Sequence, residues 1–117
     1  MRILLVEDHE STRDALSHLL SKRNHVVTLA ATAREARILA EKHKFDLIIS
    51  DIGLPDGSGF DLMKELNARH GLRGIAITGY GMDHDVNSSR ESGFRTHLTK
   101  PVHVQALEKA LSTAMAD

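Results

Sequence analysis

Five residues whose side chains could handle a phosphoryl group stand at the ends of short, mostly apolar runs of this 117-residue chain. If these runs are parallel strands of one sheet, their carboxyl ends meet at one edge, where open α/β sheets bind ligands. Each residue alone has an ordinary explanation as a cap, turn former or β-former, but their convergence favours a functional site. They are Glu7 and Asp8 after Arg2–Val6, Asp51 after Asp46–Ser50, Thr78 ending Gly74–Thr78, and Lys100 after Arg95–Leu98.

Three carboxylates in one cleft repel one another unless a cation joins them. Two of them roughly 4 Å apart repel by about 4 kcal/mol at an effective dielectric constant near 20. Carboxylates with a backbone carbonyl and waters suit octahedral Mg²⁺. Segment 52–59, IGLPDGSG, must bend just past Asp51, which would bring the Gly53 carbonyl to the metal. The alternative is an ordinary strand-to-helix loop that ends in a cap.

The cation and the Lys100 ammonium can neutralise phosphoryl oxygens while a phosphate passes to a carboxylate. Thr78 is placed to donate a hydrogen bond to another phosphoryl oxygen, and the small Gly79 leaves room for the incoming group. The residues therefore predict phosphoryl transfer to Asp51.

The strands that must position these residues alternate with helical patterns along the whole chain. The runs Arg2–Val6, Asp46–Ser50 and Gly74–Thr78 are nearly continuous in apolar residues, which is typical of central parallel strands covered on both faces. The more mixed runs His25–Leu29 and Arg95–Leu98 predict outer strands. Connections between parallel strands need crossovers, which are usually helices.

Apolar residues at helical spacing mark four helices, and Ser58 is the expected N-cap of the third. Their stripes are Ala15, Leu16, Leu19 and Leu20; Ala33, Ala36, Leu39 and Ala40; Leu62, Met63 and Leu66; and Val104, Leu107, Leu111 and Ala114. A further helix is expected over Met82–Ser92, weakly held because it has few apolar anchors. The whole is one α/β domain over residues 1–117, a doubly wound five-stranded parallel sheet of (βα)5 type.

Composition excludes several other classes of protein. The net charge of −1, from 15 basic and 16 acidic residues, argues against direct binding of nucleic acid. No apolar run approaches the roughly 20 residues of a membrane span, so we expect no membrane contact. Cysteine is absent, which excludes disulfides and thiolate sites. The eight histidines are scattered, and we expect no zinc site. A soluble cytoplasmic domain is the natural expectation.

Four motifs together resemble the receiver domains of response regulators in two-component signalling. They are LLVEDH, IISDIGLPDGSGFDL, AITGY and LTKP, and they occur in the family's order and at its spacing over nearly the whole chain. The resemblance implies the flavodoxin-like, CheY-like strand order 2-1-3-4-5. It also implies a phosphoacceptor signalling domain, not an enzyme in its own right, that assists its own phosphorylation and dephosphorylation.

The resemblance also assigns roles to individual positions. Asp51 matches the phosphoacceptor, and the carboxylates of Asp8 and Asp51 with the Gly53 carbonyl match the direct Mg²⁺ ligands. Glu7 would contribute to the Mg²⁺ site through water. Lys100 matches the lysine that binds the phosphoryl group, and the following Pro101 the proline of a Lys-Pro pair whose bond is often cis. Thr78 matches the switch hydroxyl.

One position departs from the family pattern. The residue that pairs with the switch threonine is commonly Tyr or Phe, and here it is His97. An imidazole could swing inward in place of the aromatic ring, or His97 could simply lie on the surface. With the ITGYG and LTKPV segments, it resembles receivers carried by hybrid sensor histidine kinases; a single-domain response regulator is the other expectation.

Partners follow from the resemblance. A histidine kinase or a histidine phosphotransfer domain would be the phosphodonor, and an output domain could lie outside this chain. Segment Met82–Ser92 would change conformation on phosphorylation.

Two other classes of protein are disfavoured. A haloacid dehalogenase-type hydrolase has a second Asp where this chain has Gly53, and a flavodoxin does not have the acidic first loop of this chain. A receiver-like interaction module that works without phosphorylation is the remaining alternative.

Overall fold

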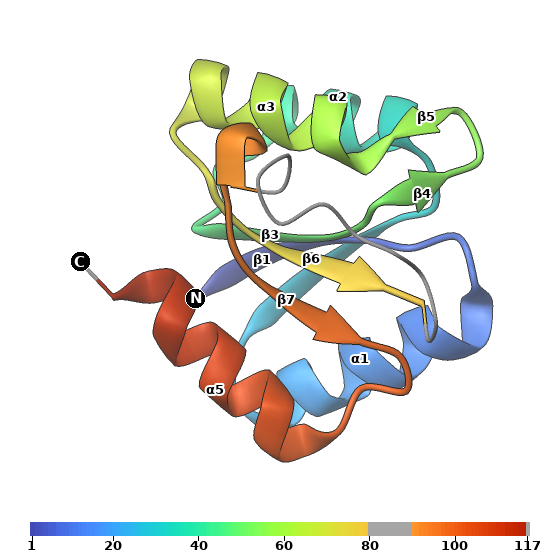
Figure 1. Cartoon of the computed structure of the whole chain (residues 1–117), viewed down its shortest axis with the longest axis vertical. Coiled ribbons are helices and arrows are strands. Elements are labelled where there is room, and N and C mark those ends of the chain that lie inside the picture. The colour runs from blue at the N-terminus through green and yellow to red at the C-terminus, as the bar shows by residue number, and fades with distance from the viewer. Residues whose placement is uncertain (80–89, 117) are drawn as a thin grey trace.

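Five parallel strands form one sheet with helices on both faces (Figure 1). The computed structural model describes residues 1–79 and 90–116. The sheet has the order β2-β1-β3-β6-β7, which is the predicted 2-1-3-4-5 counted over the long strands, and the predicted outer strands lie at its edges. The long strands are β1 (Arg2–Val6), β2 (Val26–Ala30), β3 (Leu47–Asp51), β6 (Arg73–Thr78) and β7 (Phe94–Thr99); the short β4 (Gly53–Leu54) and β5 (Gly57–Ser58) pair as an antiparallel hairpin.

The helices divide the core into two layers. Helices α2 (Ala33–Lys42) and α3 (Gly59–His70) cover one face of the sheet, and α1 (Glu10–Lys22) and α5 (Val104–Met115) cover the other (Figure 1). Because side chains of a strand alternate between its faces, β1 sends Leu4 and Val6 into the α2–α3 layer and Ile3 and Leu5 into the α1–α5 layer. This double burial explains why the central strands are continuously apolar.

Two predicted strands are shifted by one residue in the structure, each for a local reason. The His25 amide donates to the Leu20 carbonyl at the end of α1, so β2 begins at Val26. Strand β3 begins after Asp46, whose carboxylate accepts the Arg2 amide at 2.7 Å, and it extends through Asp51. Strands β6 and β7 contain the predicted runs and are slightly longer. The phosphoacceptor candidate is therefore the last residue of β3 itself.

The helix predicted over Met82–Ser92 lies outside the described residues except for its end, where Arg90–Ser92 is helical. Ser58 is the N-cap of α3, as predicted, and its hydroxyl accepts the Phe60 amide at 3.1 Å. None of the helices within residues 1–79 and 90–116 combines the length and apolar character that a membrane span requires.

Asp56 ties the β4–β5 turn to the start of α2. Its two carboxylate oxygens accept the backbone amides of Ala33 at 2.8 Å and Arg34 at 3.0 Å. These amides belong to the first turn of a helix, which leaves its N–H groups without intrahelical partners and favours a negative charge. The two hydrogen bonds hold the pKa of Asp56 below its ordinary value of 3.8. The loop that follows Asp51 is thereby attached to a separate helix.

Replacing Asp56 with alanine is expected to lower stability at neutral pH. Because the pKa of Asp56 is lowered on folding, its contribution is present above pH 3.8 and is lost as the pH falls through the folded-state pKa. The melting temperatures of wild type and Asp56→Ala should therefore differ at pH 7 and converge in acid. A gap of constant size down to pH 3 would contradict this role for the carboxylate.

Candidate functional site

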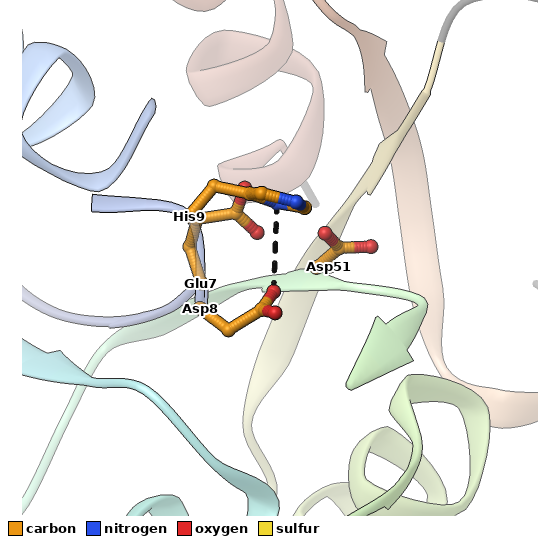
Figure 2. A group of neighbouring side chains, drawn as sticks. All are labelled: Glu7, Asp8, His9 and Asp51. Atoms are coloured by element: carbon orange, nitrogen blue, oxygen red, sulfur yellow. Dashed lines mark hydrogen bonds and ion pairs between the residues drawn. The ribbon is translucent and has the colours of Figure 1, made fainter. Parts of the chain in front are cut away.

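The polar residues predicted at the strand ends lie at the same edge of the sheet. Glu7 and Asp8 follow β1, Asp51 ends β3, and Lys100 follows β7. Figure 2 shows the side chains of Glu7, Asp8, His9 and Asp51 gathered over this edge. One potential ligand atom from each of these four residues lies within 4.8 Å of the others. The carboxylates of Glu7, Asp8 and Asp51 therefore lie close together at this edge, as the sequence predicted.

Lys100 bridges two of the carboxylates. Its Nζ lies 2.5 Å from Glu7 Oε1 and 3.0 Å from Asp51 Oδ2. The lysine is held in place through its own backbone, since the Lys100 amide donates to the Thr78 carbonyl at 2.9 Å. The Lys100-Pro101 peptide bond is cis, as the resemblance implied. The ammonium therefore reaches the Asp51 oxygens from the end of β7, two strands away from β3.

Asp51 is buried but keeps well-defined polar partners. It is 5% exposed, and its Oδ1 accepts the Gly53 amide at 3.0 Å while Oδ2 faces Lys100. Burial raises the pKa of Asp51, but the contacts with Glu7, the Gly53 amide and Lys100 outweigh it and leave that pKa below its ordinary value. An ionised carboxylate is the form that can act as a nucleophile.

Glu7 occupies the most restrictive environment of the site. It is 0% exposed, and its Oε2 receives no hydrogen bond from any donor in the described part of the chain. Burial first, and the neighbouring Asp51 carboxylate second, raise the pKa of Glu7 to about 7. Because a buried carboxylate oxygen without a donor is costly, this atom indicates that the site is built for a cation. The oxygen-rich donor set fits Mg²⁺.

The Lys100 ammonium is stabilised by the same charges. Partial burial lowers the pKa of Lys100, but its hydrogen bonds to Glu7 and Asp51 outweigh that effect and leave the pKa raised. Lys100 therefore stays positively charged beside Asp51 throughout the neutral pH range. A fixed positive charge at this place can neutralise oxygens of a transferring phosphoryl group.

Thr78 ends β6 at this edge, and His97 lies on the adjacent strand β7. Thr78 is 2% exposed, and its hydroxyl donates to the Leu98 carbonyl at 3.4 Å. His97 is exposed on β7, in register with Ala76 of β6. The predicted roles of Thr78 as a switch hydroxyl and of the Gly53 carbonyl as a metal ligand stay predictions.

His9 is a member of the cluster that sequence reasoning missed. Its Nδ1 lies 3.3 Å from Glu7 Oε1 and 3.5 Å from Asp8 Oδ1. It is also 3.3 Å from Lys100 Nζ. The signal in the sequence is that His9 follows the acidic pair directly, and helical spacing of histidines does not detect it.

Comparison with known proteins identifies the family of this chain. Residues 3–112 match the response regulator receiver domain family. The chain belongs to this family. Its members act in two-component signalling, and an acidic pocket that binds Mg²⁺ is general among them.

Individual relatives differ in how much of their length this receiver domain spans. An uncharacterized 14.6 kDa protein of Leptolyngbya boryana, from the sodA1 3′ region, is 39% identical over 87% of this chain and 80% of its own length. The response regulator PilR of Pseudomonas aeruginosa is 34% identical over 97% of this chain but only 26% of its own length. The chemotaxis response regulator CheY4 of Vibrio cholerae superposes with a TM-score of 0.88, at 29% identity over 97% and 98% of the two chains.

The raised pKa of Glu7 predicts that the receiver domain loses stability as the pH rises. A folded-state pKa of about 7 against an ordinary 4.5 means that this contribution is full below pH 4.5 and is lost as the pH rises through 7. The upper bound of the loss is about 3 kcal/mol. Urea unfolding in EDTA should show a decline between pH 5 and 8 for wild type and a much smaller one for Glu7→Gln. Equal declines in both proteins would refute this assignment.

Gly59 keeps the backbone of the receiver domain compact next to Asp51. The Gly59 amide donates to the Ile52 carbonyl at 2.8 Å. A β-carbon built at Gly59 would overlap the Asp51 carbonyl oxygen and lie 2.7 Å from Ile52 Cα. Both obstacles are backbone atoms, which cannot move aside as a flexible side chain does. The close contact with Gly59, the first residue of α3, thus constrains the backbone from which the Asp51 side chain extends.

Replacing Gly59 with alanine is expected to cost about 1–3 kcal/mol of unfolding free energy through overpacking. The backbone of Asp51 must shift, so phosphoryl uptake by the folded variant should also fall. Gly57→Ala is the matched control, because a β-carbon at Gly57 meets no atom within 4 Å. Urea unfolding of both variants checks the prediction, which fails if Gly59→Ala is as stable as Gly57→Ala.

Proposed function

We propose that Asp51 accepts a phosphoryl group from a phosphohistidine of a partner protein, in the presence of Mg²⁺. The observation that carries this proposal is the contact of Lys100 Nζ with Asp51 Oδ2 at 3.0 Å, beside the buried Glu7 carboxylate. A nucleophile, a fixed ammonium and a cation-binding set of oxygens are the components that phosphoryl transfer requires. Membership in the receiver family supports the same chemistry.

The chain supplies position and charge for the transfer. An Asp51 carboxylate oxygen forms a bond to phosphorus as the bond from phosphorus to the donor imidazole nitrogen breaks. The negative charge spreads over the three other phosphoryl oxygens, and the Lys100 ammonium is close enough to Asp51 to neutralise one of them. The Gly53 amide, which donates to Asp51 Oδ1 at 3.0 Å, orients the carboxylate.

The candidates to hold the cation are the carboxylates of Asp8 and Asp51 and the Gly53 carbonyl, with Glu7 contributing through water. Bound there, Mg²⁺ would neutralise further phosphoryl oxygens and reduce repulsion between the incoming group and the carboxylates. The unsatisfied Glu7 Oε2 supports this assignment because a bound cation or its water would give that oxygen a partner.

Phosphorylation would be reported outward through Thr78. A phosphorylated Asp51 carries about two negative charges in place of one. The Thr78 hydroxyl, which now donates to the Leu98 carbonyl, would exchange that long bond for one to a phosphoryl oxygen. Such an exchange shifts the β6–β7 edge between two pre-existing states and changes the surface offered to a partner or output domain.

The phosphodonor would be a histidine kinase or a histidine phosphotransfer domain. Because PilR is much longer than the part it shares with this chain, and CheY4 is not, both a larger protein and a single-domain regulator are contexts that relatives support. We place the domain in the cytoplasm, without direct contact with nucleic acid or membrane. An interaction module that never carries phosphate is disfavoured, since it would not need Lys100 beside Asp51.

Incubating the domain with acetyl phosphate tests the proposal. With Mg²⁺ present, the intact mass should rise by one phosphoryl group within minutes to hours, and with EDTA in place of Mg²⁺ it should not. The modified protein should lose the group again on standing, as expected for an acyl phosphate. An unchanged mass with Mg²⁺ and a folded protein would overturn the proposed function.

A further inference from the structure

The His9 side chain does not perform the capping role that is usual at its position in the backbone. His9 is the N-cap of α1, where a short polar side chain commonly accepts a helix amide, yet its imidazole makes no capping hydrogen bond. The ring instead lies alongside the acidic cluster (Figure 2), with Nδ1 facing Glu7 Oε1 and Asp8 Oδ1. The side chain is 65% exposed, so it can adjust its position without disturbing the core.

We propose that the His9 imidazole is an additional ligand of the cation site and raises its affinity for a borderline divalent ion, such as Co²⁺, more than its affinity for Mg²⁺. This proposal rests on the proposed function only in using the same cluster. A ligand atom of His9 lies within 4.8 Å of ligand atoms of Glu7, Asp8 and Asp51, so a single ion can be shared. The buried Glu7 Oε2, which has no donor among the described residues, points independently to a ligand in this cluster.

This difference follows from the chemistry of the donor atoms. Mg²⁺ favours oxygen ligands, keeps several waters and gains little from an imidazole. Divalent ions later in the first transition series bind nitrogen more strongly, and imidazole suits them. Adding one nitrogen to three carboxylates therefore raises the affinity for Co²⁺ more than that for Mg²⁺. The alternative is that His9 only donates a hydrogen bond or pairs electrostatically with Glu7 and Asp8.

Calorimetric titration of the domain with CoCl₂ and with MgCl₂ tests this difference without any phosphodonor. His9→Ala should weaken Co²⁺ binding about tenfold or more and Mg²⁺ binding less than about twofold. His9→Asn, which keeps a hydrogen-bonding side chain but offers an oxygen ligand, should lose the extra Co²⁺ affinity as well. His18→Ala is the matched control, since His18 is exposed further along the same helix, and it should bind both ions like wild type.

Proton NMR of the Co²⁺-loaded domain gives a direct readout of ligation. A strongly shifted, exchangeable imidazole N–H signal is expected in wild type and His18→Ala and should be missing in His9→Ala. Equal Co²⁺ affinities in wild type and His9→Ala, or a His9→Asn protein that binds Co²⁺ as tightly as wild type, would overturn the ligand role while leaving the proposed function intact. Failure of both ions to bind wild type would overturn the cation site in both proposals.

Discussion

Asp51→Asn is expected to abolish phosphoryl uptake from acetyl phosphate. Asparagine keeps the shape of the side chain but replaces an ionised carboxylate with a neutral amide. Within the described residues, the Asp51 carboxylate is the only group of the site that contacts both Lys100 and the Gly53 amide. A neutral amide oxygen is a far weaker nucleophile than a carboxylate. The variant should nevertheless fold. Without the Asp51 charge, the buried Glu7 carboxylate has lost a negatively charged neighbour that disfavours its ionised form and raises its pKa.

Asp61→Asn is the matched control for this substitution. Asp61 is an exposed residue in the first turn of α3, and the same chemical change there should leave phosphoryl uptake near the wild-type level. Intact-mass measurement under identical acetyl phosphate and Mg²⁺ conditions compares the three proteins. Uptake by Asp51→Asn equal to that of Asp61→Asn would show that the acceptor lies elsewhere.

Lys100→Met is expected to slow phosphoryl uptake by about 10²-fold or more, the usual effect of removing one group that stabilises developing charge. Methionine retains an unbranched apolar chain but removes the ammonium that lies between Glu7 Oε1 and Asp51 Oδ2. That ammonium lowers the pKa of both carboxyl groups. Without it both pKa values should rise, so the pH at which half-maximal uptake is reached should also rise.

The rate of uptake, measured as a function of pH, checks both parts of this prediction. Lys64→Met, at an exposed position of α3, is the control for a general loss of positive charge and should retain wild-type kinetics. A Lys100→Met protein with an unchanged rate and pH profile would mean that the ammonium has no role in the transfer, despite its contacts.

The division into central and outer strands and the convergence of carboxylates could be predicted because they depend on repeating patterns and a general rule of sheet topology. The strand order itself was implied by the resemblance to receiver domains. Successive residues of β1, such as Ile3 and Leu4, alternate between two buried faces, which makes a central strand recognisable as an apolar run. Parallel strands then bring their carboxyl ends together at one edge. Glu7, Asp51 and Lys100 therefore meet although they come from the beginning, the middle and the end of the chain.

Other features depend on contacts that no periodic pattern encodes. Asp56 accepts the Ala33 amide of α2, which lies 23 residues away in the sequence. Nothing in the sequence distinguishes Asp56 from any other aspartate in a loop. Gly59 is required by the close approach of the Asp51 backbone, whereas Gly57, in the same loop, faces no such obstacle. The contact of the His9 ring with the Glu7 carboxylate likewise depends on the conformation of the side chain, which no periodic pattern encodes.

The most direct test of the central claim is to locate the phosphoryl group in the chain. Reduction of the phosphorylated domain with borohydride converts an aspartyl phosphate to homoserine, and peptide mass spectrometry then identifies the altered residue. We predict homoserine at position 51 alone, only when Mg²⁺ was present. Homoserine at another aspartate, or phosphate retained on a histidine or a hydroxyl group, would contradict the account.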